Sequence, residues 1–343
     1  MDLLKHLCDL PGIPGREERV RSFIESQLGG VVDDLSTDAL GNLIALKKGS
    51  GTNPKRVMII AHMDEIGFYV KHIDDDGFLR IHNVGGFDVR QLLSKHVTVT
   101  TSHGDDLVGV LMANLKPPHT LNKADAQKMP TVGNLFVDLG LNAEAVKERV
   151  RIGDMVTLKP TFQDMGKRVS SKAMDDRVGC WVLMNTLKNL QTPENDVYGV
   201  FSVQEEVGLR GATTSAFSLE PDIGIALDVT LAMDIPGAEA QDYISELGKG
   251  VAIKVLDGNS ISTRWLVDEF VEVAEKNEIE HQLEILTAGG TDAAQIQLSR
   301  SGVPSITLSI PCRYVHTSAE MIDKEDAQAT VELLTAYLSQ TSA

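Results

Sequence analysis

The sequence predicts an α/β protein in which a mainly parallel sheet, flanked by helices, is interrupted by a small, mostly β insertion. Short continuous apolar runs alternate with helical periodicity toward both ends of the chain, which is typical of buried parallel strands joined by helices. Between residues 70 and 164 the pattern changes to short alternating segments broken by Asp-Gly, Gly-Gly and Pro-Pro, with helical periodicity only at 142–150. We therefore expect an α/β domain formed by residues 1–69 and 165–343, with a second domain inserted at 70–164.

The first elements follow from apolar spacing and from turn residues. Leu3–Leu10 is predicted to be a helix that ends at the Pro- and Gly-rich segment 11–15, and a second helix starts near Glu17. Residues 43–46 and 57–61 are continuous apolar runs, so both are predicted to be buried strands.

After residue 167 the α/β alternation returns. Four further apolar runs are predicted to be strands: 198–203, 223–229, 251–255 and 305–310. Four segments with helical spacing alternate with them: 176–190, 265–277, 293–301 and 324–339.

Composition excludes several classes of function. The 343 residues include 32 Lys+Arg and 49 Asp+Glu, a net charge of −17, which argues against nucleic acid or an anionic membrane surface as the main partner. No stretch approaches the roughly 18 apolar residues of a membrane span, and the N-terminus lacks the apolar core of a signal peptide. The widely spaced cysteines Cys8, Cys180 and Cys312 fit neither a disulfide framework nor a CxxC metal site. We expect a cytoplasmic protein.

Residues able to bind metals recur directly after the predicted strands. They are His62 with Asp64, the pair Glu205 and Glu206, Asp228 and His316, and Asp175 lies just before a predicted helix. Because the carboxyl ends of parallel strands border the ligand crevice of an open sheet, we expect these side chains at one rim. Two imidazoles with several carboxylates suit zinc, or a similar ion such as cobalt or manganese. Two such ions would need one shared carboxylate, which makes a two-metal site the sharper hypothesis.

The adjacent glutamates Glu205 and Glu206 fit this hypothesis for a geometric reason. Neighbouring side chains diverge in an extended segment, so both are unsuited to binding one metal in the same way. One can be a ligand while the other holds the proton of an activated water, the division of labour that hydrolysis needs.

Each of these residues alone also has a simpler explanation. Asp176, which precedes a predicted helix, is also explained as an N-cap. A lone His at a strand end is more often a hydrogen-bonded residue than a ligand, and the Glu pair could be a solvated turn. His72, His82, His96 and His103 fall in the alternating region, where surface or sheet-packing roles are expected.

Five motifs then occur in a familiar order. They are His62-Met63-Asp64-Glu65, Lys172-Ala173-Met174-Asp175-Asp176-Arg177, Gln204-Glu205-Glu206-Val207-Gly208, Gly289-Gly290-Thr291-Asp292 and Arg313-Tyr314-Val315-His316-Thr317. Together they resemble the tetrahedral (TET) aminopeptidases, the family of glutamyl and deblocking aminopeptidases with two co-catalytic metals. Asp228-Val229-Thr230 and Lys116-Pro117-Pro118-His119 add to the resemblance, which covers nearly the whole chain.

The resemblance implies the co-catalytic zinc peptidase type of fold, with a β-barrel as the insertion, and a set of metal ligands. Asp175 would bridge the two metals, His62 and Asp228 would complete one site, and Glu206 and His316 the other. The ions would be Zn²⁺ or Co²⁺. The barrel would mediate dimerisation, and dimers in this family assemble into a hollow dodecamer.

The resemblance also implies roles beyond metal binding. Glu205 would be the general base and later the acid that protonates the leaving amine, and Asp64 would fix the orientation and basicity of the His62 imidazole. Asp292 either belongs to a turn before the next helix or helps to hold a free amine. Arg313 either attracts an acidic substrate side chain or braces the loop of His316. His119 is either a loop residue or part of the assembly interface.

The predicted function is a two-metal aminopeptidase that removes N-terminal residues from short peptides, with a metal-bound hydroxide as nucleophile and Glu205 as proton relay. The alternative is a metal-dependent amidohydrolase or deacylase acting on a non-peptide amide. A third possibility is a non-enzymatic assembly protein stabilised by metal. Glu205 argues against the third, because a closed structural site has no use for an unliganded carboxylate.

Overall fold

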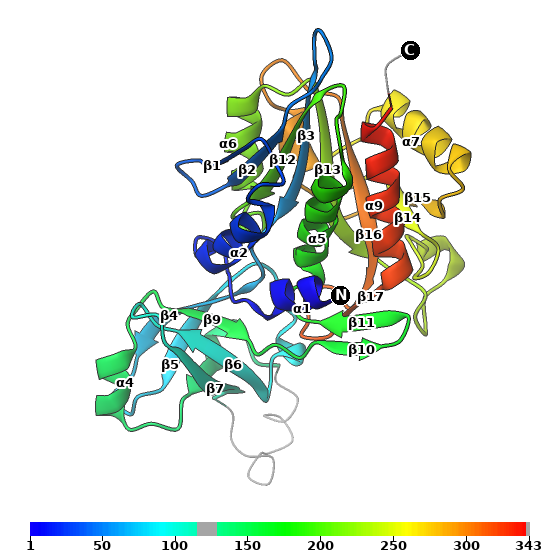
Figure 1. Ribbon diagram of the computed structural model, residues 1–343. Coiled ribbons are helices and arrows are strands. Elements are labelled where there is room, and N and C mark those ends of the chain that lie inside the picture. The colour runs from blue at the N-terminus through cyan, green and yellow to red at the C-terminus, as the bar shows by residue number, and fades with distance from the viewer. Residues whose placement is uncertain (115–128, 341–343) are drawn as a thin grey trace.

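The computed structural model describes residues 1–114 and 129–340 of the 343-residue chain (Figure 1). The predicted motif that ends at His119 lies outside these residues. Within the described residues, no helix combines the length and apolarity that crossing a bilayer requires.

The larger part of the molecule is built on a mixed sheet, which has eleven strands within the described residues. These strands are β1 (Asp34–Thr37), β2 (Leu43–Lys47), β3 (Arg56–His62), β10 (Gln163–Met165), β11 (Arg168–Ser171), β12 (Asp196–Ser202), β13 (Ile223–Leu231), β14 (Val251–Leu256), β15 (His281–Ile285), β16 (Ser305–Arg313) and β17 (Glu320–Asp323). Their order is β1-β2-β12-β3-β13-β16-β17-β11-β10, with β14 paired to β16 and β15 added to β14.

The centre of this sheet is parallel, as the continuous apolar runs predict. β12, β3, β13 and β16 are neighbours and run parallel to one another, while antiparallel strands are added on both sides. The β3 side chains alternate between the two faces, with Val57 and Ile59 in one apolar core and Met58 and Ile60 in another. A strand buried on both faces has to be apolar throughout, which explains its sequence.

Helices cover both faces of the sheet (Figure 1). They are α1 (Asp2–Asp9), α2 (Glu18–Leu28), α5 (Met174–Asn189), α7 (Arg264–Lys276) and α9 (Lys324–Leu338) on one face, and α6 (Arg210–Leu219) and α8 (Ala293–Gln297) on the other. α5 packs on β3 and β13 at the centre of the first face, and α6 and α8 pack against each other on the second. The predicted fold class is thereby confirmed.

Two helices differ from the sequence prediction. α8 ends at Gln297, four residues before the predicted end at 301. α6 was not predicted, because its sequence RGATTSAFSL contains Gly and several Ser and Thr, which favour helices weakly. Tertiary packing stabilises α6 instead, through the buried small side chains of Ala212 and Ala216.

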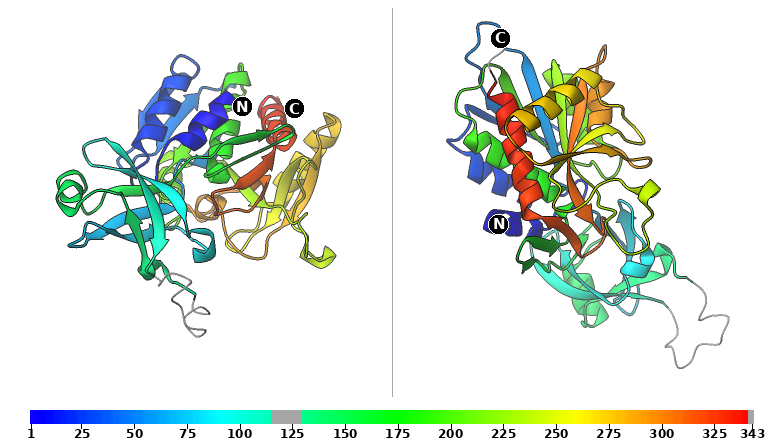
Figure 2. Two further views of the ribbon diagram at one scale, coloured as in Figure 1. Left: turned by 90° about the horizontal axis from the view of Figure 1, so that it is seen from below. Right: turned by 90° about the vertical axis from the view of Figure 1, so that its right-hand side faces the viewer.

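The smaller part is a closed antiparallel barrel, set apart from the sheet in Figures 1 and 2. Its strands within the described residues are β4 (Gly67–Ile73), β5 (Leu79–Val84), β6 (Lys95–Thr100), β7 (Asp106–Ala113), β8 (Leu135–Asp138) and β9 (Met155–Leu158), in the order β4-β5-β8-β7-β6-β9. Helix α4 (Ala143–Arg149) packs against the barrel through Val146, and short 3₁₀ turns occur in this part at Val89–Gln91 and Val132–Asn134. A third 3₁₀ turn, Ala240–Asp242, lies in the larger part, between β13 and β14. The barrel has an apolar core of its own.

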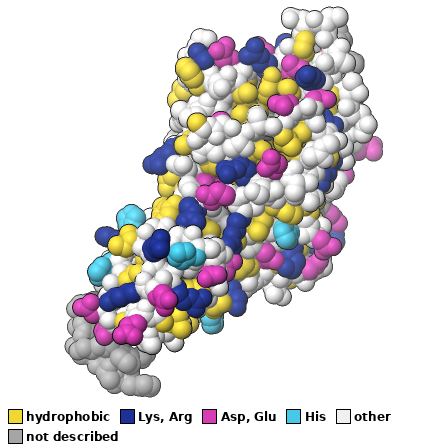
Figure 3. All heavy atoms as spheres, turned by 60° about the vertical axis from the view of Figure 1, so that its left-hand side comes forward, with side chains coloured by type: hydrophobic (Ala, Val, Ile, Leu, Met, Phe, Trp, Pro, Cys, Tyr) yellow, Lys and Arg dark blue, Asp and Glu magenta, His cyan; other side chains and the backbone are white. Residues whose placement is uncertain are grey.

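The surface carries charges of both signs. Figure 3 shows acidic and basic side chains interspersed over the face that it presents, without a large area of one sign. The barrel histidines His72, His82, His96 and His103 are all exposed, in keeping with the surface role expected for them.

Candidate functional site

The central strands deliver the predicted metal-binding residues to one end of the sheet. His62 is the last residue of β3, and Asp228 lies in β13 two residues beyond Ala226, which pairs with Ile60. Glu206 follows the end of β12, and His316 follows the end of β16. These four residues and Asp175 form two groups of three: His62, Asp175 and Asp228, and Asp175, Glu206 and His316. The possible ligand atoms of each group lie within 4.8 Å of one another.

Asp175 belongs to both groups because its two carboxylate oxygens face different histidines. Oδ1 lies 3.0 Å from Nε2 of His62, and Oδ2 lies 3.2 Å from Nε2 of His316. Nε2 of His316 also lies 3.4 Å from Oε1 of Glu206. A carboxylate that presents one oxygen to each of two ligand sets has the arrangement that a shared ligand of two metals needs.

The start of α5 holds Asp175 in this position. Asp175 and Asp176 have non-helical backbone angles and are joined by a cis peptide bond. One oxygen of Asp176 accepts a hydrogen bond from the Gly179 amide at 3.0 Å, and the other accepts one from the His62 amide at 3.2 Å. Asp176 is thus a capping residue that also ties the helix to the end of β3, which is the simpler explanation considered for it.

Glu320 supports the site, although the sequence analysis missed it. Its side chain is buried, Oε2 accepts a hydrogen bond from the Asp175 amide at 3.1 Å, and Oε1 accepts one from the His316 amide at 2.8 Å. The available signal in the sequence was an acidic residue four positions after His316. That signal is too common on its own to indicate a role.

Asp64 organises the loop of the two glutamates. Its carboxylate accepts hydrogen bonds from the backbone amides of Glu205 and Glu206, both at 3.1 Å. The Nδ1 atom of His62 lies 3.0 Å from the backbone carbonyl oxygen of Asp64 and 3.7 Å from its carboxylate. Residue 64 therefore contacts the imidazole mainly through its main chain, while its side chain fixes the glutamates.

The barrel also reaches the site, through the glycines that follow β5. A Cβ atom on Gly85 would lie 2.4 Å from Ile66 and 3.2 Å from Oε2 of Glu206, and one on Gly86 would lie 3.5 Å from Nδ1 of His316. Gly85 also has a φ of +82°, which favours glycine. The positive φ and the close approach to Ile66 explain the glycine at position 85, whereas a Cβ on Gly86 would make an ordinary contact with His316.

Several carboxyl groups of the site are buried close together, an arrangement that bound cations would stabilise. Burial raises the pKa of Asp228, and the nearby carboxylate of Asp175 raises it further. Burial likewise raises the pKa of Glu205, and Asp228 adds to the shift. Oε1 of Glu206 has no hydrogen-bond partner within the described residues. A crowd of buried carboxylates with an unsatisfied oxygen fits a pair of divalent ions.

A cavity of about 490 Å³ opens on these residues. Gly289, Gly290 and Thr291 line it, as the resemblance implies, but Asp292 does not: that side chain is buried and accepts a hydrogen bond from the Ser202 hydroxyl at 2.7 Å. Arg313 does not line the cavity either, because its Nε donates to Asp234 at 2.8 Å.

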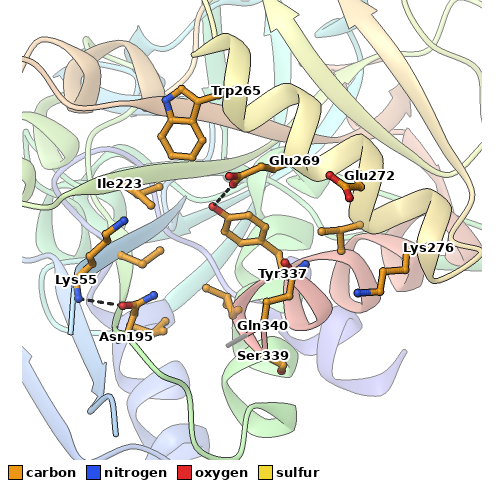
Figure 4. Close-up of a pocket in the computed structure, with 14 residues that line it drawn as sticks. Lys55, Asn195, Ile223, Trp265, Glu269, Glu272, Lys276, Tyr337, Ser339 and Gln340 are labelled. Atoms are coloured by element: carbon orange, nitrogen blue, oxygen red, sulfur yellow. Dashed lines mark hydrogen bonds between the residues drawn. The ribbon is translucent and has the colours of Figure 1, made fainter. Parts of the chain in front are cut away.

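A second cavity, of about 660 Å³, lies where the central strands begin (Figure 4). Lys55 precedes β3 and Asn195 precedes β12, while Glu269 of α7 accepts a hydrogen bond from the hydroxyl of Tyr337 of α9 at 3.3 Å. Its described lining includes none of the residues of the two metal-binding groups. The two candidate metal-binding groups therefore lie at the opposite end of the strands.

Comparison with known proteins identifies the family. The family model described as M42 glutamyl aminopeptidase matches residues 41–333, a span that contains the whole site. The chain belongs to the M42 aminopeptidase family. As a member of it, the protein is a hydrolase of the exopeptidase class, and the predicted resemblance is confirmed.

Three proteins similar to this M42 aminopeptidase match it over almost their entire lengths. It is 37% identical over 347 residues to a lysyl aminopeptidase from Pyrococcus furiosus, which covers 99% of this chain and 96% of that one. The structure of an aminopeptidase from the archaeon Desulfurococcus kamchatkensis is 40% identical and superposes with a TM-score of 0.94, over 99% of this chain and 94% of that one. The Pyrococcus horikoshii TET1 peptidase, described as assembling into a tetrahedron or a large octahedral shell, is 34% identical with a TM-score of 0.88, over 99% of both chains.

Proposed function

We propose that this M42 aminopeptidase removes N-terminal residues from short peptides by means of two divalent metal ions. The observation that supports this most strongly is the position of Asp175, whose two oxygens face the imidazoles of His62 and His316. Asp228 would complete the first ligand set and Glu206 the second. Imidazole and carboxylate ligands of this kind suit Zn²⁺ or Co²⁺.

When bound, the ions would polarise the scissile carbonyl and lower the pKa of the attacking water. The protein itself supplies the proton relay. Glu205 lines the cavity beside the proposed ligands, and burial raises its pKa well above the usual range of a glutamate, which strengthens it as a base. In this proposal Glu205 takes a proton from the attacking water and then gives it to the leaving amine. Asp64 holds the Glu205 backbone in place for both transfers.

The decisive experiment compares Glu205→Gln with Glu206→Gln, the same change at the neighbouring residue. Glu205→Gln should keep the metal content of the wild type and lose about 10²- to 10⁴-fold in kcat, the usual contribution of a general base. Glu206→Gln should lose bound metal as well as activity. Full peptidase activity in Glu205→Gln would remove Glu205 from the role of base, and equal metal loss in both variants would contradict the division of roles.

We further propose that residues 70–164 form a dimerisation domain and that the dimers assemble into a dodecamer, as a similar TET1 structure described as a dodecamer favours. Strand β7 supports this, because Val108 and Met112 are 53% and 38% exposed on the outside of the barrel. Light scattering that finds only monomers at working concentration would contradict the proposal. A cytoplasmic location is consistent with the three cysteines, which are all free and buried.

A further inference from the structure

Beyond the metal-binding residues, the cavity has a second wall that is uncharged. From this wall we infer that the enzyme prefers peptides with a neutral aliphatic N-terminal residue, such as leucine, and discriminates against both acidic and basic ones. The inference rests on the proposed function, because it assigns this part of the cavity to the N-terminal side chain of the substrate.

The apolar part of the wall comes from four separate segments of the chain. It consists of Leu209, Val229, Leu231, Leu286, Ala288 and Val315. The ionisable side chains among the described lining residues are those of the proposed metal site: His62, Asp175, Glu205, Glu206, Asp228 and His316. In the proposal, the metals offset the charge of these carboxylates. The rest of the described lining therefore offers a substrate side chain no charge.

The threonines of the wall are also engaged elsewhere. The Thr230 hydroxyl donates to the buried carboxylate of Glu284 at 2.6 Å, and the Thr291 hydroxyl donates to the buried carboxylate of Asp257 at 3.4 Å. A hydroxyl whose proton is directed into the protein cannot donate it to a substrate carboxylate. Asn259 is the remaining polar side chain of the described wall, and it is uncharged.

The charged side chains that contact the wall are engaged within the protein, and the buried Asp257 carboxylate accepts hydrogen bonds from the Asn259 backbone amide at 2.9 Å and the Thr291 hydroxyl at 3.4 Å. Nζ of Lys254 donates to Glu284 at 2.7 Å, with both side chains wholly buried behind Thr230. Arg313, the cation closest in sequence to His316, is paired with Asp234 at 2.8 Å. Among the described lining residues outside the proposed metal site, an acidic N-terminal side chain would thus find no cation, and a basic one would find no anion.

The uncharged composition of the wall predicts which N-terminal residues the enzyme prefers. A charged side chain entering the wall would lose hydration without gaining a partner, which is strongly unfavourable. Each methylene group that fits an apolar pocket, by contrast, improves discrimination by about 10- to 200-fold. The chain therefore differs in substrate from the glutamyl activity in the description of its family and from the lysyl activity of its Pyrococcus furiosus relative.

The test measures kcat/KM of the metal-loaded enzyme for the leucyl, alanyl, glutamyl and lysyl 4-nitroanilides. We expect the leucyl amide to exceed the alanyl one by at least about 10-fold and the two charged ones by about 100-fold. A glutamyl or lysyl amide cleaved as fast as the leucyl one would overturn the inference and leave the aminopeptidase function intact. Cleavage of none of the four would overturn the proposed function as well.

A matched pair of variants tests the wall directly. Leu286 is only partly buried, so a polar side chain can be accommodated there. Leu286→Glu should raise the ratio of lysyl to leucyl kcat/KM by about 10-fold or more, while Leu286→Gln, of the same size but neutral, should not. Equal ratios in the two variants would mean that Leu286 does not face the N-terminal side chain, and would overturn the assignment of the wall. As a readout independent of turnover, calorimetry should find that free leucine binds more tightly than glutamate or lysine.

Discussion

The buried carboxylate of Glu320 accepts a hydrogen bond from the backbone amide of Asp175 at 3.1 Å. Its other oxygen accepts one from the amide of His316 at 2.8 Å. A single side chain therefore fixes the backbone of the two residues that face each other across the proposed second metal. Groups that orient metal ligands in this way commonly affect metal affinity almost as strongly as the ligands themselves.

Glu320→Gln should weaken metal binding without unfolding the protein. An amide side chain has one acceptor oxygen in place of two, so the Asp175 or the His316 amide loses its partner. We expect about a 10- to 100-fold loss of affinity for one of two metals, measured by competition with a chelator. Glu325→Gln, the same change at an exposed residue of α9, is the control and should bind metal as the wild type does. Identical affinities in both variants would leave Glu320 without a positioning role.

Asp175→Asn should reduce bound metal by more than one equivalent per subunit. The reason is that both proposed ligand sets share this carboxylate, so that its replacement disturbs both. Elemental analysis of the purified variant beside the wild type measures the effect. An unchanged stoichiometry would exclude a bridging role for Asp175.

Lys254→Met should destabilise the fold by about 3–5 kcal/mol, because it leaves the wholly buried Glu284 without its cation. Combining it with Glu284→Gln should recover much of this loss, since the uncompensated charge is then removed. Urea denaturation of the three proteins gives the free energies of unfolding. If Lys254→Met alone were as stable as the wild type, Lys254 would not be needed to neutralise Glu284.

The ionisation of Asp326 should lower the free energy of unfolding as the pH rises. Burial raises the pKa of this carboxyl to about 7, even though its oxygens accept hydrogen bonds from the amides of Gly248 and Gly250. In the unfolded chain the value is about 3.9. Between these two values the folded state holds a proton that the unfolded state has released, so the free energy of unfolding decreases as the pH rises from about 4 to 7. Asp326→Asn should flatten this decrease, and parallel pH profiles for the two proteins would contradict the assignment.

The site residues at the carboxyl ends of strands could be predicted from the sequence. His62 and Asp228 end or interrupt short apolar runs that are typical of buried strands, and parallel strands bring such positions to one edge. The register bears this out, since Ala226 pairs with Ile60 and places Asp228 level with His62. The barrel histidines could also be distinguished from the predicted ligands, because they fall in the inserted segment with alternating apolar and polar residues.

The hydrogen bonds that support the site could not be predicted in this way. Glu320 lies 145 residues from Asp175 in the chain, and the pairing of β17 with β11, which sets Glu320 opposite Ser171, brings it beside the start of α5. Asp64 acts on Glu205 through a backbone amide 141 residues away, which no local pattern encodes. α6 was missed for a related reason, because its stability comes from packing rather than from helical propensity.

The most direct test of the two-metal account is metal content measured on the same sample as activity. The purified enzyme should hold two divalent ions per subunit, lose activity in parallel with metal during chelation, and regain it when two equivalents of zinc or cobalt are restored. Full cleavage of the leucyl amide by a sample shown to contain no metal would contradict the account.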